Sequence, residues 1–178
     1  MRYWKISLFA LLALFTFSCE EDFTFEPSED NESGTVVEPD PEPTGAISAE
    51  YQLLLDLTND LRAAGCDCGG QYMPPVTAVS WSTTIATAAL AHSRDMDQNN
   101  HFDHTGTDGS SPGDRLTEAG YNWRTYGENI ALRYTTASAV FNGWKNSPGH
   151  CRNMMNAGFK EMGAAQVGDY YTQDFGAR

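Results

Sequence analysis

The stretch KEMGAAQVGDYYTQDFG, Lys160–Gly176, decides the fold class of this chain. It holds two apolar-rich runs separated by the pair Gly168–Asp169, a combination typical of a tight turn between two strands. Strands joined by so short a turn are antiparallel, because a parallel pair needs a crossover of about a dozen residues. The C-terminal part of the chain is therefore expected to be a β-hairpin and not part of a parallel nucleotide-binding sheet.

Upstream of the hairpin the sequence favours helices. Four segments combine an N-cap residue or a helical spacing of apolar residues with a glycine or proline stop. They cover residues 48–65, 82–100, 111–120 and 136–147. Residues 121–134 are expected to be extended, residues 66–76 to form a Gly- and Pro-rich loop, and residues 151–155 to form a brief helical turn. Helices that precede antiparallel strands predict an α+β domain with packed layers.

The N-terminus has the pattern of an export signal. Arg2 and Lys5 precede the apolar run ISLFALLALFTF, which at 12 residues is shorter than the roughly 20 that a membrane-spanning helix needs. The pair Ser18–Cys19 resembles the lipobox of bacterial lipoproteins, in which the cysteine is acylated. We therefore expect a lipoprotein signal peptide over residues 1–18 and a lipid anchor at Cys19. This places the protein in the bacterial cell envelope, at the outer-membrane surface or in the periplasm; plain cleavage and secretion is the alternative.

Charge divides the rest of the chain into two parts. Residues 20–46 hold ten carboxylates, no Lys or Arg and half of the chain's eight prolines, so residues 19–46 are expected to be a disordered tether. Residues 47–178 carry 14 acidic and nine basic residues, a net charge of −5, and are long enough for one domain with its own core. Such a charge balance offers nothing to attract nucleic acid.

The four histidines differ in their sequence context. His92 lies on the apolar face of the second helix and is interpreted as a core residue with a hydrogen-bonding partner. His101 ends that helix, where a cation favours the helix dipole. His104 and His150 both lie in glycine-containing turns, where side chains are available for chemistry. These two are therefore the candidate functional histidines.

Five motifs, taken together, carry a resemblance to a known family. They are LAHSRDM, HFDHTGTDG, YGENIA, WKNSPGHCRNMMN and YYTQDFG. In order and spacing they resemble the CAP superfamily, which comprises the cysteine-rich secretory proteins, antigen 5 and pathogenesis-related proteins, and whose domain is also called the SCP domain. The resemblance covers residues 47–178 and is strongest to the bacterial secreted branch. It implies a three-layer α-β-α sandwich with a central antiparallel sheet.

The resemblance also implies a cleft lined by two histidines and two acidic residues. Matched motif by motif, three of them are His104 of FDHTG, Glu128 of GEN and His150 of PGH. Pro148 and Gly149 are expected to end the fourth helix and to turn His150 toward the other two. The second acid is missing, because Ser147 stands where the family's carboxylate is expected.

Two neutral imidazoles and one carboxylate can hold a divalent cation, Zn²⁺ or Mg²⁺, and leave a position open for water. His104, Glu128 and His150 are therefore the expected metal ligands, with no cofactor required for folding. One alternative is a hydrogen-bonded network that pins three loops onto the sheet. Another is a hydrolase; a triad of Ser147 with a histidine and Glu128 is disfavoured, because a serine before proline at a helix end more often serves as a local hydrogen-bonding residue.

The cysteines favour an oxidising, extracytoplasmic compartment. The resemblance to bacterial relatives implies that Cys68 pairs with Cys151. A disulfide that closes a loop of about 80 residues stabilises a fold by roughly 4 kcal/mol. Cys66 is then a free thiol or, alternatively, the true partner of Cys151.

Together these features predict a lipid-anchored binding or interaction module rather than an enzyme. Its ligand is expected to be a protein, a peptide or a lipid, with membrane contact through the N-terminal anchor and no binding of nucleic acid. A metal-assisted hydrolase of peptide or cell-wall material and a lipid- or sterol-binding protein are the alternatives.

Overall fold

The computed structural model describes residues 47–178. The expected signal peptide, the lipid anchor at Cys19 and the tether lie outside these residues. Within the described part of the chain, no helix combines the length and the apolar character that crossing a membrane requires.

The elements follow the expected order of helices before a C-terminal hairpin. The helices are α1 (Ala49–Ala64), α2 (Thr83–Asn99), α3 (Pro112–Glu118), α4 (Ala137–Asn146) and α5 (Pro148–Met154). The strands are β1 (Cys66–Asp67), β2 (Tyr72–Met73), β3 (Ser80–Trp81), β4 (Thr125–Leu132), β5 (Glu161–Val167) and β6 (Tyr170–Ala177). Ser48 and Ser111, the N-caps expected for the segments 48–65 and 111–120, are confirmed, since their hydroxyls each accept a backbone hydrogen bond in the first turn; Ser82 caps α2 in the same way.

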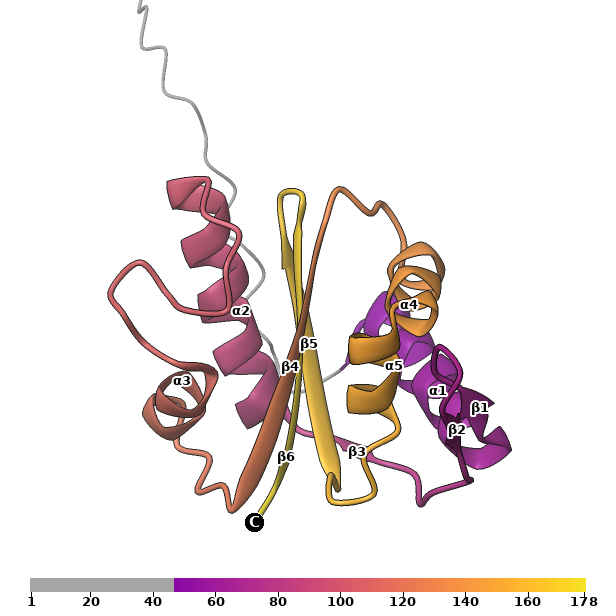
Figure 1. Ribbon diagram of the computed structural model, residues 1–178. Coiled ribbons are helices and arrows are strands. Elements are labelled where there is room, and N and C mark those ends of the chain that lie inside the picture. Colours follow the sequence, from indigo (N-terminus) through magenta and orange to yellow (C-terminus); the bar gives the residue numbers. More distant parts are fainter. Residues whose placement is uncertain (1–46) are drawn as a thin grey trace, which may run out of the picture. The chain divides into compact units, whose positions relative to one another are not determined.

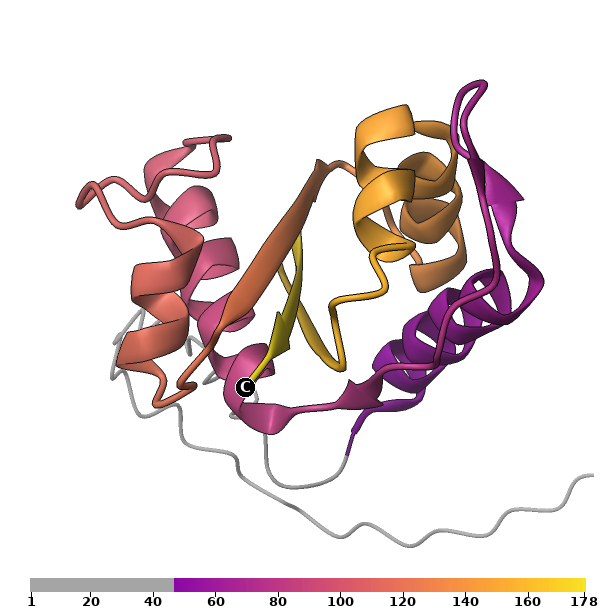
Figure 2. The same ribbon diagram turned by 60° about the horizontal axis from the view of Figure 1, so that its bottom comes forward.

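Three layers form the domain, as expected (Figure 1). The main sheet has the strand order β3-β5-β6-β4, with α2 and α3 on one face and α1, α4 and α5 on the other (Figures 1 and 2). The pairs β5–β6 and β6–β4 are antiparallel, and the turn between β5 and β6 contains Gly168 with a φ of 52°. The sheet is not purely antiparallel, because the two-residue strand β3 runs parallel to β5.

Two local expectations are wrong. Residues 66–76 are not all loop, since β1 and β2 form a small antiparallel pair around the turn at Gly69 and Gly70. Pro148 does not simply end a helix: α4 ends at Asn146, and Pro148 begins α5, which contains His150. Proline suits the first position of a helix, because its missing N–H would have no partner there.

Close packing fixes the sheet between its two helical layers. A Cβ atom at Gly163 in the middle of β5 would lie 2.2 Å from the backbone nitrogen of Ala86, so only glycine lets α2 approach the sheet this closely. On the opposite face, the buried Trp144 of α4 donates a hydrogen bond from its indole nitrogen to the carbonyl of Ile130 in β4. Strand β4 is therefore held firmly at the edge of the sheet.

Candidate functional site

A pocket of about 580 Å³ opens at the edge strand β4. The segment after α2 brings His104 to it from one side of the sheet, and α5 brings His150 from the other. The pocket is lined by His104, Glu128, Asn129, Gly149, His150, Arg152, Asn153 and Asn156. Three of the four predicted cleft residues thus share one pocket. Ser147 is not among its lining residues; it lies between α4 and α5 and makes no side-chain cap for α5.

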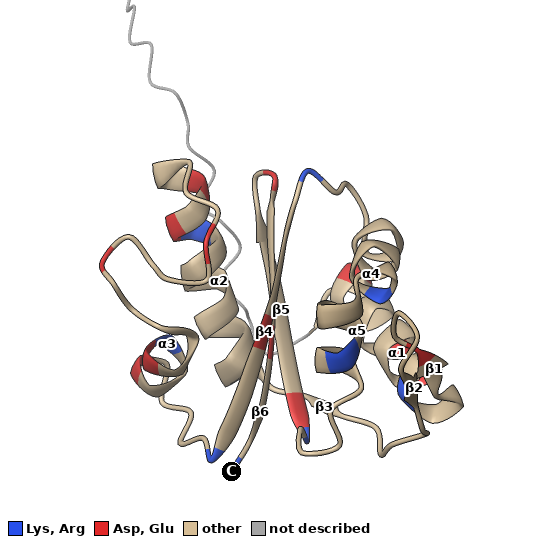
Figure 3. Cartoon of the chain, viewed as in Figure 1, with Lys and Arg blue, Asp and Glu red and all other residues tan. Residues whose placement is uncertain are grey.

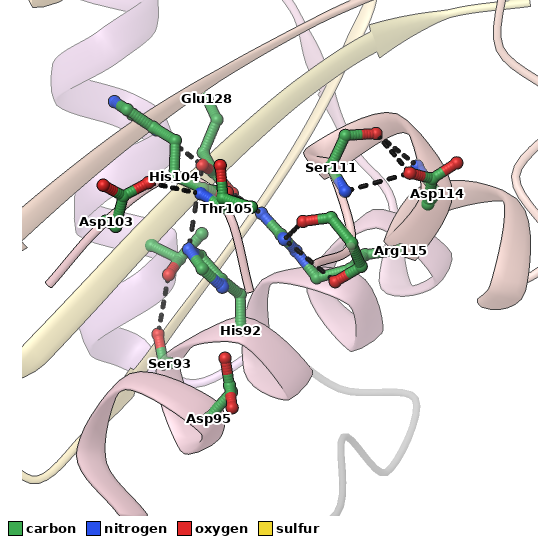
Figure 4. A network of polar contacts seen from close by, with 12 residues as sticks. His92, Ser93, Asp95, Asp103, His104, Thr105, Ser111, Asp114, Arg115 and Glu128 are labelled. Carbon is green, nitrogen blue, oxygen red and sulfur yellow. Dashed lines mark hydrogen bonds and ion pairs between the residues drawn. The ribbon is translucent and has the colours of Figure 1, made fainter. Parts of the chain in front are cut away.

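Glu128 is the centre of the polar contacts, and its side chain is only 2 % exposed. Its Oε1 atom accepts a hydrogen bond of 2.6 Å from Nδ1 of His104, and its Oε2 atom accepts one of 2.7 Å from the guanidinium of Arg115. Figure 4 shows His92, His104 and Arg115 gathered around this carboxylate. Both oxygens of Glu128 are therefore already engaged by protein groups.

The hydrogen bond to Glu128 raises the pKa of His104, against an opposing effect of partial burial. Because the pKa of His104 is raised in the folded state, the bond stabilises the fold fully below about pH 6.5, the ordinary pKa of histidine. This stabilisation is lost as the pH rises through the pKa of His104 in the folded protein. Because the His104 side chain is 51 % exposed, solvent screens the pair and reduces this contribution.

Glu128→Gln is expected to lower the pKa of His104 toward its ordinary value, because the glutamine keeps the shape of the acceptor but carries no charge. The measurement is a pH titration of the imidazole resonances by NMR. Glu118→Gln is the matched control, since Glu118 is exposed on α3 and its loss should leave the titration of His104 unchanged. An unchanged His104 pKa in Glu128→Gln would contradict a direct contact between His104 and Glu128.

His150 has a different electrostatic character from His104. It lies in the first turn of α5 and is half-buried, and its pKa is lowered by burial and by the charge of His104. At neutral pH its ring is therefore uncharged, and within residues 47–178 that ring has no hydrogen-bonding partner. A neutral imidazole that faces a pocket is a competent metal ligand.

The structure does not bring the three predicted metal ligands into one compact set. In residues 47–178, only one group of His, Cys, Asp or Glu side chains has all its ligand atoms within 4.8 Å of one another, a spacing that could hold a metal ion. This group consists of Cys66, Cys68 and Cys151. Glu128 instead lies behind His104 and orients its ring. A carboxylate that accepts from one ring nitrogen fixes the tautomer and leaves the other nitrogen to bind a cation.

Three residues of this site were not predicted from the sequence as functional: His92, Arg115 and Asp174. His92 is fully buried as expected, its Nε2 lies 3.8 Å from Oε1 of Glu128, and it also interacts with the backbone of Asp103. Asp174 lies directly opposite Glu128 in the β4–β6 register, and its buried carboxyl interacts with that of Glu128. No sequence signal marks Asp174 or Arg115, because the register of the β5–β6 hairpin does not reveal that β6 also pairs with β4.

Burial shifts the pKa values of Asp174 and His92. It raises the pKa of Asp174 well above the usual value, and the nearby carboxylate of Glu128 raises it further. Burial also lowers the pKa of His92. Burial therefore favours the uncharged forms of Asp174 and His92.

The opposite face of the same strands carries a chain of amide groups. Asn153 of α5 donates to Asn129, Asn129 donates to Gln173 of β6, and Gln173 donates to the hydroxyl of Thr58 in α1. The first of these bonds is 3.0 Å long and ties the helix that carries His150 directly to β4. The position of His150 relative to Glu128 is thus fixed by hydrogen bonds as well as by packing.

Residues 55–176 of the chain match the CAP family, described as the cysteine-rich secretory protein family. The chain belongs to the CAP family. A crystal structure of an extracellular protein containing an SCP domain from Bacillus anthracis superposes with a TM-score of 0.65 and 32 % identity, over 72 % of this chain and 40 % of that one.

Two Bacillus subtilis proteins are also similar to this CAP domain. The uncharacterized membrane protein YlbC is 34 % identical over 68 % of this chain, and the uncharacterized protein YkwD is 33 % identical over 73 %. The matches cover 33 % and 48 % of those two proteins, so the chain spans about a third to a half of their lengths.

A disulfide joins the β1–β2 hairpin of the CAP domain to α5. It links Cys68 with Cys151, as the resemblance implied, across a sequence separation of 83 residues. Cys66 is a free thiol. The bond holds α5 from the side opposite to its contacts with β4.

Proposed function

We propose that this CAP domain is an extracytoplasmic binding module, anchored to the cell envelope through Cys19, whose pocket at β4 holds a divalent cation between His104 and His150. Two relatives support the location, since one is an extracellular SCP-domain protein and the other is a membrane protein. Cys19→Ala is expected to move the protein from the membrane fraction of its host to the soluble or secreted fraction. An unchanged distribution would contradict the anchor.

The observation that carries the cation proposal is the hydrogen bond of 2.6 Å between Nδ1 of His104 and Glu128. It leaves Nε2 of His104 for a ligand, and the uncharged ring of His150 lines the same pocket. Two imidazoles suit Zn²⁺ better than Mg²⁺, which prefers oxygen ligands. This refines the expected ligand set, since Glu128 orients His104 rather than binding the ion itself.

The remaining lining of the pocket favours a polar partner. Besides the two histidines, the pocket is lined by Arg152 and the amides of Asn129, Asn153 and Asn156, so its lining is mostly polar. A carboxylate or main-chain carbonyl of a protein or peptide would complete the coordination of the cation and accept from these donors. Acidic and basic residues are interspersed along the chain in the view of Figure 3, and the net charge of −5 over residues 47–178 does not favour nucleic acid.

Calorimetric titration of Zn²⁺ into the purified protein tests the proposal. We expect binding at one site with a Kd near micromolar or tighter, and a loss of at least about tenfold in affinity in both His104→Ala and His150→Ala. His101→Ala is the matched control, because His101 does not line the pocket and bonds to the carbonyl of Thr105. Equal binding in all four proteins, or no binding, would overturn the cation site and leave a purely structural network.

A further inference from the structure

Cys66 lies beside the Cys68–Cys151 disulfide and has no part in the function proposed above. Its Sγ atom is 3.6 Å from Sγ of Cys68 and 3.5 Å from Sγ of Cys151. We call Cys66, Cys68 and Cys151 the cysteine cluster. A thiol this close to both sulfur atoms of a disulfide is placed to react with it by thiol–disulfide exchange.

The local sequence explains why Cys66 and Cys68 both lie next to Cys151. Cys66 and Cys68 are two residues apart, and alternate residues of an extended strand point to the same side. The turn that follows is tight, because the N–H of Cys68 donates to the carbonyl of Gln71. This hairpin lies beside α4 and α5 (Figure 2), so both side chains reach the same place on α5, where Cys151 lies.

We propose that Cys66 and Cys68 exchange as the disulfide partner of Cys151. The thiolate of Cys66 attacks Sγ of Cys151, the Cys66–Cys151 bond forms while the Cys68–Cys151 bond breaks, and Cys68 leaves as a thiolate that takes up the released proton. One disulfide and one thiol exist before and after the step, so no oxidant or reductant is consumed. Sγ of Cys66 lies at nearly equal distances from the two bonded sulfurs, and therefore beside the disulfide rather than in line with it. The Cys66 side chain must rotate before its sulfur can attack Cys151 along the axis of the disulfide bond.

The partial exposure of Cys66 also makes the disulfide accessible to external thiols. Cys68 and Cys151 are fully buried, whereas Cys66 is half-buried and is the most exposed residue of the cluster. External thiols and disulfides therefore reach the buried bond through Cys66. Burial raises the pKa of the Cys66 thiol, against an opposing effect of the nearby Lys145 ammonium, so little thiolate is present at neutral pH and exchange is slow.

The exchange changes how the hairpin is attached to α5. Gly69 packs on Pro148 at the start of that helix, where a Cβ atom would lie 2.5 Å from Cγ of the proline ring. Moving the link from Cys68 to Cys66 shifts it by two residues, about 6.6 Å along a strand. Because Sγ of Cys66 already lies 3.5 Å from Sγ of Cys151, the new bond needs only a small local adjustment of the hairpin against the first turn of α5, which contains His150 next to Cys151. The exchange itself does not depend on cation binding, although this consequence reaches the proposed pocket.

The test counts thiols in the full chain carrying Cys19→Ala, so that every thiol belongs to the cluster. With Cys68→Ser added, the air-oxidised protein is expected to contain a Cys66–Cys151 disulfide and to show no titratable thiol after denaturation. Two titratable thiols would overturn the proposal, because Cys66 would then be unable to replace Cys68. Cys66→Ser is the matched control and should keep the Cys68–Cys151 bond.

A second measurement follows the exchange in the chain with all three cysteines of the cluster intact. The protein is incubated in mildly alkaline buffer, quenched in acid, alkylated, digested and mapped by mass spectrometry. Both disulfide-linked peptides, Cys66–Cys151 and Cys68–Cys151, are expected. Recovery of Cys68–Cys151 alone after prolonged incubation would overturn exchange in the native protein, whatever the outcome of the zinc titration.

Discussion

Arg62→Met is expected to lower the free energy of unfolding by about 3–5 kcal/mol, because the change removes a buried charge from its hydrogen-bonding partners. Arg62 of α1 is completely buried, and its guanidinium donates to the carbonyls of four residues: Thr77, Met154, Asn156 and Phe159. Burial lowers its pKa, because removal from water disfavours the charged guanidinium. Methionine fills a similar volume but leaves the carbonyls without a donor.

Chemical denaturation measures this loss, with Arg152→Met as the matched control. Arg152 is exposed on α5, so the same change of side chain there should alter the free energy of unfolding by about 0.5 kcal/mol or less. Arg62→Lys is expected to fall between the two, because an ammonium keeps the charge but cannot reach all four carbonyls. A loss below about 1 kcal/mol in Arg62→Met would show that Arg62 does not hold α1 to the end of α5.

Cys151→Ala is expected to cost about 4.5 kcal/mol, from the loop entropy released when a link across 83 residues is lost. Both sulfur atoms of the bond are completely buried, so the change also removes packing around α5. The free energy of unfolding of the oxidised proteins, measured in urea, provides the comparison. Cys66→Ala is the matched control and should cost about 1 kcal/mol or less, because the Cys68–Cys151 bond persists.

Cys68→Ala should cost clearly less than Cys151→Ala, since Cys66 can then take over the bond to Cys151. Equal losses in Cys68→Ala and Cys151→Ala would mean that Cys66 forms no replacement bond. A loss in Cys151→Ala no larger than in Cys66→Ala would contradict the stabilising role of the disulfide altogether.

Local signals were sufficient to predict most of the fold. The apolar spacing and N-caps of the helices, and the Gly168–Asp169 turn, act within a few residues, so they can be recognised without knowledge of tertiary contacts. The parallel pairing of β3 with β5 could not be predicted in this way, because Ser80 and Glu161 lie far apart in the chain and meet only in the folded sheet. Likewise, Pro148 is compatible with both the end of one helix and the start of the next.

The candidate site, too, was predicted from local motifs only in part. His104, Glu128 and His150 lie in motifs that carried the resemblance, and the structure places all three at one pocket. What the motifs could not indicate is that Arg115 occupies one oxygen of Glu128 and His104 the other. These contacts join residues 13 and 24 positions apart in the chain through tertiary packing, and they turn the expected ligand Glu128 into a residue that orients His104.

X-ray absorption at the zinc edge, on protein loaded with one equivalent of Zn²⁺, tests the central claim most directly. Two groups of candidate ligands lie in the described domain, the histidine pair at β4 and the cysteine cluster, whose Cys68–Cys151 bond would have to be reduced before its sulfurs could bind zinc. We predict nitrogen and oxygen neighbours at about 2.0–2.1 Å with the scattering pattern of imidazole, lost in His104→Ala. Sulfur neighbours at about 2.3 Å would show that zinc binds the cysteines instead, and would contradict a cation site between His104 and His150.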